Sequence, residues 1–288
     1  MKQAIEMALS KIGDETSIVK WESVSGGSIN QAFYVSTGKQ EYFAKLNRTA
    51  PDGFFKAEEK GLNILSSHGI RVPKPLVLLP RGETEMVFLM EWISPARSNK
   101  QSERSLGRLV ANMHHNTVDM AGLDHSNYIG ELHQENNQTD DWVTFYRDQR
   151  LGIMQDIANE AGVLSGDRDR RLTKMRERLD LFIGHKPDFS LLHGDLWDGN
   201  RLVNENDEPY LIDPAVYYGD REIDIAFTYL FGGYTEGFYA QYDADYPLEK
   251  EWEDRIPVYQ LYYLLVHLVL FGESYGSAVD RILQKYTT

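Results

Sequence analysis

The most informative motif in this chain is His193-Gly194-Asp195-Leu196-Trp197-Asp198-Gly199-Asn200. It places a carboxylate, Asp195, five positions before an amide, Asn200. A second carboxylate, Asp213, follows thirteen positions later, directly after the short apolar run Tyr210–Ile212. Carboxylate and amide oxygens are the hard ligands that Mg²⁺ prefers, and a carboxylate can also accept a proton. The three residues therefore indicate a site that combines a base with a divalent cation.

The spacing of this stretch is that of the catalytic loop of protein kinases, H-x-D-L-x-x-x-N, with Gly194 where arginine usually stands. In that arrangement Asp195 is the base that orients and deprotonates a hydroxyl, and Asn200 and Asp213 hold Mg²⁺ against the phosphates of ATP. The alternative is a set of ordinary turn residues between two short strands, where Asp, Asn and Gly are common. The loop alone does not decide between the two.

The residues upstream favour the first interpretation because of their order. The Gly-rich turn Gly26-Gly27-Ser28 separates the first two predicted strands, and Lys45 lies on the third. Glu58 follows on the next predicted helix, where it would pair with Lys45 and hold it toward the α- and β-phosphates of ATP. Glu58 is preferred over Glu59 because it lies on the buried face of that helix. Each feature alone is ordinary. Their order along the chain, with the Gly-rich turn first, then Lys45, Glu58 and the catalytic loop, predicts a nucleotide-binding site.

Apolar periodicity changes partway along the chain. Residues 18–46 and 76–92 form short β-branched and aromatic runs bounded by turns, which predicts a small antiparallel sheet. One helix, with Asp52 as its N-cap, is inserted after the third strand. Beyond Pro95 apolar residues recur at three- and four-residue steps, which predicts helices. We therefore expect an α+β, bilobal, protein-kinase-like fold.

The predicted boundary gives an N-lobe of residues 1–93 and a larger, mostly helical C-lobe of residues 94–288, with the ligand cleft between them. Backbone groups of Met90, Glu91 and Ile93, just before this boundary, are predicted to bind the adenine of ATP.

Composition narrows the possible partners. The chain has 288 residues, and 30 Lys and Arg against 44 Asp and Glu give a formal net charge of −14. This charge argues against binding to nucleic acid or to anionic membranes, which need basic surfaces. The absence of Cys excludes disulfides, thiolate metal sites and Cys nucleophiles, and it fits a cytoplasmic protein. The most apolar stretch, Val258 to Phe271, is too short to span a bilayer and is predicted to be a buried helix.

Longer motifs carry a resemblance to one family. The run from Ile212 to Ala226, IDPAVYYGDREIDIA, closely resembles the fructosamine kinase (ketosamine 3-kinase) family, which is related to aminoglycoside and choline phosphotransferases. Further agreement comes from Asn127-Tyr128-Ile129-Gly130, Leu230-Phe231-Gly232-Gly233 and Tyr259-Gln260-Leu261-Tyr262. The resemblance covers nearly the whole chain.

The resemblance implies phosphorylation by ATP of the 3-hydroxyl of ketosamines, the adducts of sugars with lysine side chains or free amines. The unstable 3-phosphate then leaves, so the family reverses glycation. Carried over to this chain, the resemblance makes Asp195 the base, Asn200 and Asp213 the Mg²⁺ ligands, Lys45 the phosphate anchor and Glu58 its partner. It gives Asp224 a structural role under the catalytic loop. Trp197 and His193 are predicted to contact the substrate, with Trp197 stacking on the sugar or its amine.

Two alternatives remain at this stage. One is a related small-molecule kinase of the aminoglycoside or choline type. The other is a kinase-like binding module without turnover, which the complete set of five expected site residues disfavours. The oligomeric state and the preferred sugar are not predicted.

Two further features are interpreted as structural. His114 and His115 are adjacent at a helix end, where their side chains do not face one another, so they are not predicted to bind a metal. Trp142 is predicted to be part of a helix core.

Overall fold

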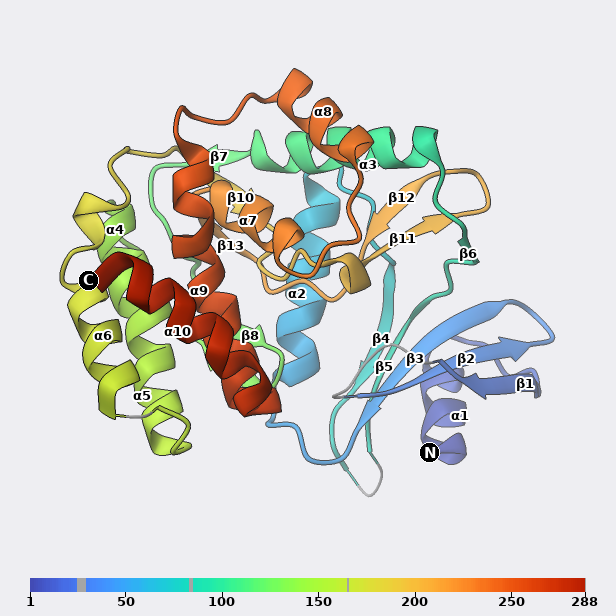
Figure 1. Cartoon of the computed structure of the whole chain (residues 1–288). Coiled ribbons are helices and arrows are strands. Elements are labelled where there is room, and N and C mark those ends of the chain that lie inside the picture. The colour runs from blue at the N-terminus through green and yellow to red at the C-terminus, as the bar shows by residue number, and fades with distance from the viewer. Residues whose placement is uncertain (25–29, 83–84, 165, 288) are drawn as a thin grey trace.

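A computed structural model describes residues 1–24, 30–82, 85–164 and 166–287. The chain forms two lobes, as the sequence predicted (Figure 1). The first contains a five-stranded antiparallel sheet in the order β1-β2-β3-β5-β4. Its strands are β1 (Ile18–Ser23), β2 (Gln31–Thr37), β3 (Glu41–Asn47), β4 (Pro75–Leu79) and β5 (Met86–Glu91). The predicted turn Gly26-Gly27-Ser28 lies outside the described residues.

Two helices accompany this sheet. Helix α1 (Lys2–Lys11), which the sequence analysis did not predict, packs Ile5 and Leu9 against the strands. Helix α2 (Phe54–Ser67) follows β3, as predicted. The expected cap at Asp52 is wrong, because Gly53 occupies the N-cap position with φ 88°. Glycine adopts this left-handed conformation without steric cost, so the helix starts after it.

The second lobe is mostly helical and carries three small antiparallel sheets. In the first, β10 (Phe189–Leu192) lies between β13 (Tyr217–Gly219) and β7 (Thr117–Val118). In the second, β11 (Arg201–Asn204) lies between β12 (Pro209–Leu211) and β6 (Pro95–Ala96). The third is the hairpin of β8 (Asn127–Ile129) and β9 (Leu132–Gln134). The turn between β10 and β11 holds the predicted catalytic loop, which includes Asp195 and Asn200.

The helices of this lobe surround these sheets (Figure 1). They are α3 (Lys100–His114), α4 (Trp142–Phe145), the π-helical η1 (Tyr146–Gly152), α5 (Ile153–Glu160), α6 (Gly166–Arg176), α7 (Glu222–Leu230), α8 (Glu236–Asp245), α9 (Trp252–Phe271) and α10 (Gly276–Thr287). Short 3₁₀ turns occur at η2 (Leu179–Leu181), η3 (Asp198–Asn200) and η4 (Glu273–Tyr275). None of the helices in the described part of the chain is long and apolar enough to cross a membrane.

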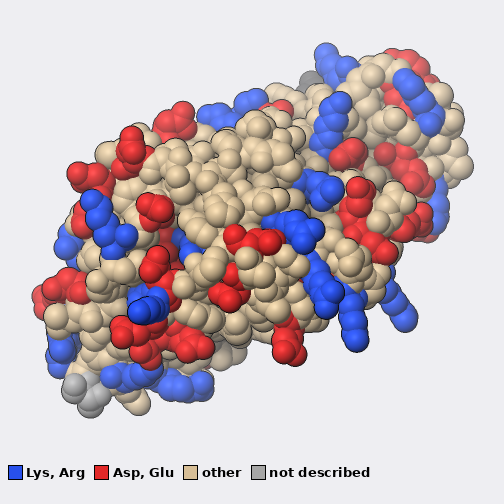
Figure 2. All heavy atoms as spheres, turned by 90° about the horizontal axis from the view of Figure 1, so that it is seen from above, with Lys and Arg blue, Asp and Glu red and all other residues tan. Residues whose placement is uncertain are grey.

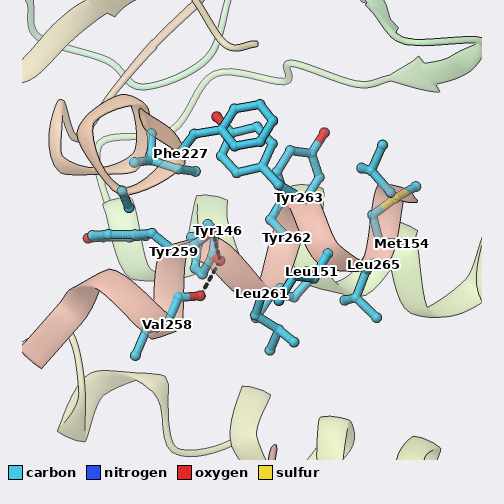
Figure 3. Close-up of a cluster of buried hydrophobic side chains, with 14 of the residues drawn as sticks. Tyr146, Leu151, Met154, Phe227, Val258, Tyr259, Leu261, Tyr262, Tyr263 and Leu265 are labelled. Atoms are coloured by element: carbon cyan, nitrogen blue, oxygen red, sulfur yellow. Dashed lines mark hydrogen bonds between the residues drawn. The ribbon is translucent and has the colours of Figure 1, made fainter. Parts of the chain in front are cut away.

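Helix α9 passes through the core of the second lobe, where its aromatic side chains pack against α4, η1 and α7 (Figure 3). The Tyr146 hydroxyl donates a hydrogen bond to the Val258 carbonyl at 2.7 Å. The Trp142 Nε1–H donates to the Tyr259 hydroxyl at 2.9 Å, which confirms the prediction that Trp142 belongs to the core. Because these buried polar groups are paired, α9 gains aromatic burial without leaving their hydroxyl groups unsatisfied.

A second hydrophobic cluster joins the two lobes. It brings Phe55, Leu62 and Leu65 of α2 together with Leu106 and Val110 of α3. This hydrophobic core contains residues from both predicted lobes, so it does not separate them at one position. The predicted boundary between residues 93 and 94 therefore stays a prediction.

Acidic and basic side chains are interspersed on the face that carries α3 and α8 (Figure 2). The net charge of −14 is therefore spread over the surface beside groups of Lys and Arg rather than gathered at one place on this face.

Candidate active site

A cavity of about 770 Å³ lies between the two lobes. The predicted site residues that line it come from the sheet, α2, the residues just after β5, the turn between β10 and β11, and the segment just after β12. They are Lys45, Glu58, Met90, Glu91, Ile93, Asp195, Trp197, Asn200 and Asp213. The fold thus brings residues that are up to 168 positions apart into one space.

The catalytic loop is shaped by hydrogen bonds within itself. The Asn200 side-chain amide donates to Asp195 Oδ2 at 2.7 Å and to the Asp195 carbonyl at 2.9 Å. Gly194 has φ 80°, and a Cβ at this position would overlap the Ala215 carbonyl. The close approach to Ala215 explains why this loop has glycine where protein kinases have arginine.

Asp224 supports the loop from below, as the sequence predicted. It lies on α7, is fully buried, and accepts hydrogen bonds from the backbone amides of His193 at 2.7 Å and Gly194 at 3.0 Å. Two backbone donors on one carboxylate fix the position of the chain immediately before Asp195.

His114 positions Asp224; the sequence predicted a structural role and no bound metal for His114, but it did not predict this contact. Its Nε2 lies 3.2 Å from Asp224 Oδ2, and its Nδ1 lies 2.8 Å from the hydroxyl of Tyr242. Burial lowers the pKa of His114, so the ring is neutral, with Nε2 as donor and Nδ1 as acceptor. The signal was available, because His114 continues the apolar stripe of Leu106 and Val110 along α3.

His193 does not line the cavity, which contradicts the prediction that it contacts the substrate. Its side chain is fully buried. Its Nε2 donates to the Ile212 carbonyl at 3.0 Å, while Nδ1 accepts from the Asp195 amide at 3.3 Å. Burial lowers the pKa of His193, in keeping with this neutral tautomer. The ring joins β12 to the catalytic loop and has no free face for a ligand.

Lys45 forms the ion pair that the sequence predicted. Its Nζ lies 2.7 Å from Glu58 Oε1 and 2.6 Å from Asp213 Oδ1. Glu59 pairs instead with Lys56 on the same helix, which confirms the choice of Glu58 as the partner. Burial alone would lower the pKa of Lys45, but the charges of Asp213 and Glu58 outweigh it and raise the pKa above its ordinary value. Lys45 is therefore a fixed cation beside two carboxylates.

Asp213 and Asn200 offer oxygen atoms that fit a divalent cation. Asp213 has φ 55°, which is unusual for a residue other than glycine. Such a backbone conformation persists only where the surrounding structure holds it, and it occurs often at functional sites. Its side chain is 40% exposed, so one carboxylate oxygen can bind a ligand while the other contacts Lys45. The Asn200 amide nitrogen is used by Asp195, and its Oδ1 has no protein partner in the described part of the chain. These are the hard donors that Mg²⁺ takes.

The Asp195 carboxylate is electrostatically unusual. Burial raises its pKa, the charges of Asp213 and Asp224 raise it further, and the hydrogen bond from Asn200 opposes the rise, with a result of about 7. A base whose pKa is near the working pH is suited to accept a proton from a hydroxyl.

Arg201 holds the other side of the catalytic loop, and the sequence analysis missed it. Its guanidinium donates to Asp198 Oδ1 and to Glu103 Oε1, both at 2.8 Å, and to the Gly233 carbonyl at 3.0 Å. These bonds join η3 to α3 and to the segment between α7 and α8. Next to this cluster of bonds, the Trp197 ring lies over Gly199, where a Cβ would overlap it. Only the folded structure shows these contacts, because the partners of Arg201 are spread along 130 residues.

Comparison with known proteins decides the family. The fructosamine kinase model matches residues 1–288. The chain belongs to the fructosamine kinase family. It is 41% identical over 266 residues to a probable ketoamine kinase of Enterococcus faecium, with 91% of this chain and 94% of that protein covered. It is 35% identical to the chloroplastic protein-ribulosamine 3-kinase of Arabidopsis thaliana, with coverage of 95% and 84%.

Solved structures agree with this family and with the predicted fold. A fructosamine-3-kinase candidate from Haemophilus somnus superposes with a TM-score of 0.90 at 28% identity and covers 98% of its own chain and 100% of this one. A choline kinase from Streptococcus pneumoniae shares the fold, with a TM-score of 0.69 at 15% identity and 99% of each chain covered. The bilobal kinase-like fold is therefore confirmed. As a fructosamine kinase, the protein is an ATP-dependent kinase that phosphorylates a hydroxyl of a ketosamine, as the sequence predicted.

Proposed function

We propose that this fructosamine kinase phosphorylates the 3-hydroxyl of ribulosamine or fructosamine adducts, with Asp195 as the base. The observation that carries the proposal is the Asp195 carboxylate. It has a pKa raised to about 7 by burial and lines the same cavity as the Lys45–Asp213 pair. A relative at 35% identity is named a protein-ribulosamine 3-kinase, which supports the 3-position.

The proposed reaction transfers the γ-phosphoryl group of ATP directly to the sugar. Asp195 accepts the proton of the 3-hydroxyl while the oxygen of that hydroxyl bonds to the γ-phosphorus of ATP. The bond from the γ-phosphorus to the β,γ-bridging oxygen breaks at the same time, and ADP leaves. Lys45, held by Glu58, contacts the phosphates. Mg²⁺, when bound through Asn200 and Asp213, would offset the negative charge on the phosphates.

The nucleotide would extend from the C-terminal end of β5 toward Lys45. Met90, Glu91 and Ile93 line the cavity there, and we assign the adenine to their backbone groups. The Glu91 side chain accepts a hydrogen bond from the Lys74 amide at 2.9 Å, so its carboxylate is occupied by the fold.

We propose that the substrates are free ketosamines or glycated lysines of proteins, and that loss of the unstable 3-phosphate removes the sugar. The lack of Cys supports a reducing compartment such as the cytoplasm as the place of the reaction. The net charge of −14 argues against nucleic acid and anionic membranes as binding partners.

A substrate panel tests this proposal. ATP consumption is measured with the ribulose and fructose adducts of lysine, with choline and with kanamycin, and ³¹P NMR identifies the phosphorylated carbon. We expect turnover with the adducts alone. The matched control is the same adduct with the 3-hydroxyl methylated, which should not be phosphorylated. The assignment is wrong if the enzyme turns over choline or kanamycin but not the adducts. It is also wrong if the methylated control is turned over as fast as the unmodified adduct.

A further inference from the structure

One end of the cavity is lined by aromatic side chains from the C-terminal ends of α7 and α9 and from η4. We call Phe231, His267, Phe271 and Tyr275 the aromatic wall. The centroid of the His267 ring lies 4.8 Å from that of Phe231, 5.4 Å from that of Phe271 and 5.0 Å from that of Tyr275. Phe231 is 41% exposed and Phe271 is 46% exposed. The wall is therefore a continuous aromatic surface that begins inside the cavity and reaches solvent.

The aromatic wall lines the same cavity as Asp195, and α9 contacts the catalytic loop directly, because the hydroxyl of Tyr263, one turn before His267, donates a hydrogen bond to the Gly194 carbonyl at 3.2 Å. The segment after β5 and the Lys45–Asp213 pair account for the nucleotide end. In Figure 1 helix α2 lies between the junction of α9 and α10 and strand β5. Trp197, which follows Asp195 closely in the catalytic loop, lines the same cavity as the wall. A sugar placed at Asp195 would therefore direct its substituent toward these rings.

The chemistry of the wall fits a cation that also donates a hydrogen bond. His267 Nδ1 lies 2.8 Å from the Tyr263 carbonyl, so Nδ1 carries the proton and donates it. Burial lowers the pKa of His267, which keeps the ring neutral. Its Nε2 is then an acceptor, and within the described residues it has no protein partner.

The wall itself contains no carboxylate, and the nearby Glu273 of η4 is paired with Arg168 at 2.8 Å. Attraction of a cation to the wall would therefore come from the ring faces and from the lone pair of His267 Nε2.

We infer that the aromatic wall binds the amine part of the ketosamine, namely its protonated secondary nitrogen and the carbon stem that follows. The inference rests on the proposed function and names the part of the substrate that the site selects. The nitrogen lies against the aromatic faces and donates to His267 Nε2, and the stem continues over Phe271 toward solvent. Because the wall reaches the surface, a lysine attached to a peptide can enter as well as a free amine.

The test compares three acceptors that share the same ribulose unit. The first carries the ε-amine of Nα-acetyl-lysine, the second carries methylamine, and the third has an ether oxygen in place of the lysine nitrogen. KM and kcat are measured for each acceptor, and KM for ATP, with the wild type and with Phe271→Ala, Tyr275→Ala and His267→Phe. Leu181→Ala is the matched control, because Leu181 is 64% exposed and does not line the cavity.

We expect Phe271→Ala and Tyr275→Ala to raise KM for the lysine adduct by about 3- to 30-fold, toward the value for the methylamine adduct. His267→Phe keeps an aromatic ring but removes the acceptor, so it should raise KM for the lysine adduct and not for the ether. KM for ATP should stay constant in all variants, and Leu181→Ala should behave as the wild type.

Two failures are distinguishable. If the wild type turns over the adducts but the wall variants change KM equally for all three acceptors, or not at all, the wall does not bind the amine and the proposed function stands. If the wild type phosphorylates no ketosamine, the proposed function is wrong and this inference falls with it.

Discussion

Replacing Asp195 by Asn should abolish most activity and yet stabilise the protein at neutral pH. In the unfolded chain an Asp has a pKa of about 3.9. In the folded protein burial, with the charges of Asp213 and Asp224, raises the pKa of Asp195 to about 7. Between these two values the unfolded chain has lost the proton and the folded protein still holds it. The stability of the folded state is therefore unaffected below about pH 4, falls as the pH rises toward 7, and is constant above that.

The size of this effect follows from the two pKa values. About three units at 1.36 kcal/mol each give about 4 kcal/mol of lost stability at pH 8, and about 1.5 kcal/mol at pH 5. An Asn side chain does not ionise, so Asp195→Asn should raise the free energy of unfolding by about 2.5 kcal/mol more at pH 8 than at pH 5. Loss of the general base should lower kcat by about 10²- to 10⁴-fold.

The assay is urea denaturation of the nucleotide-free, metal-free protein at pH 5 and pH 8, together with steady-state kinetics. The wild-type kcat/KM should rise with pH through about 7, because only the ionised carboxylate accepts a proton. Asp180→Asn is the control, since Asp180 is exposed on η2 and away from the cavity. Near-normal turnover of Asp195→Asn refutes the role of the base. Equal stabilisation at both pH values refutes the electrostatic reasoning.

Two further variants test how the site is held. Lys45→Ala leaves Glu58 and Asp213 without their cation, so we expect a raised KM for ATP and a loss of about 3–5 kcal/mol in the free energy of unfolding. Lys56→Ala, which breaks the exposed pair with Glu59, should cost about 0–1 kcal/mol, and similar losses in the two variants would contradict the assignment. Gly199→Ala places a Cβ against the Trp197 ring and should lower kcat/KM for the ketosamine by about 10- to 100-fold without changing KM for ATP. Gly184→Ala, where a Cβ meets only open space, is its control, and full activity in Gly199→Ala would mean that the position of Trp197 does not matter for the substrate.

The parts of the site that depend on short-range geometry could be predicted from the sequence alone. The spacing from Asp195 to Asn200 lies within one loop, and the choice of Glu58 over Glu59 depends on the repeat of one helix. Local periodicity also distinguished the sheet from the helical lobe. These features could be predicted because neighbouring residues in one element have a fixed spatial relation.

The surroundings of those residues became known only from the folded structure. His193 is buried against Ile212, although its place in the motif suggested a ligand contact. His114 reaches Asp224 across 110 positions, and Arg201 reaches Glu103 across 98. The pKa of Asp195 and the neutral ring of His267 also depend on burial by distant segments. No local pattern encodes such contacts, because they exist only once packing has brought separate elements together and excluded water between them.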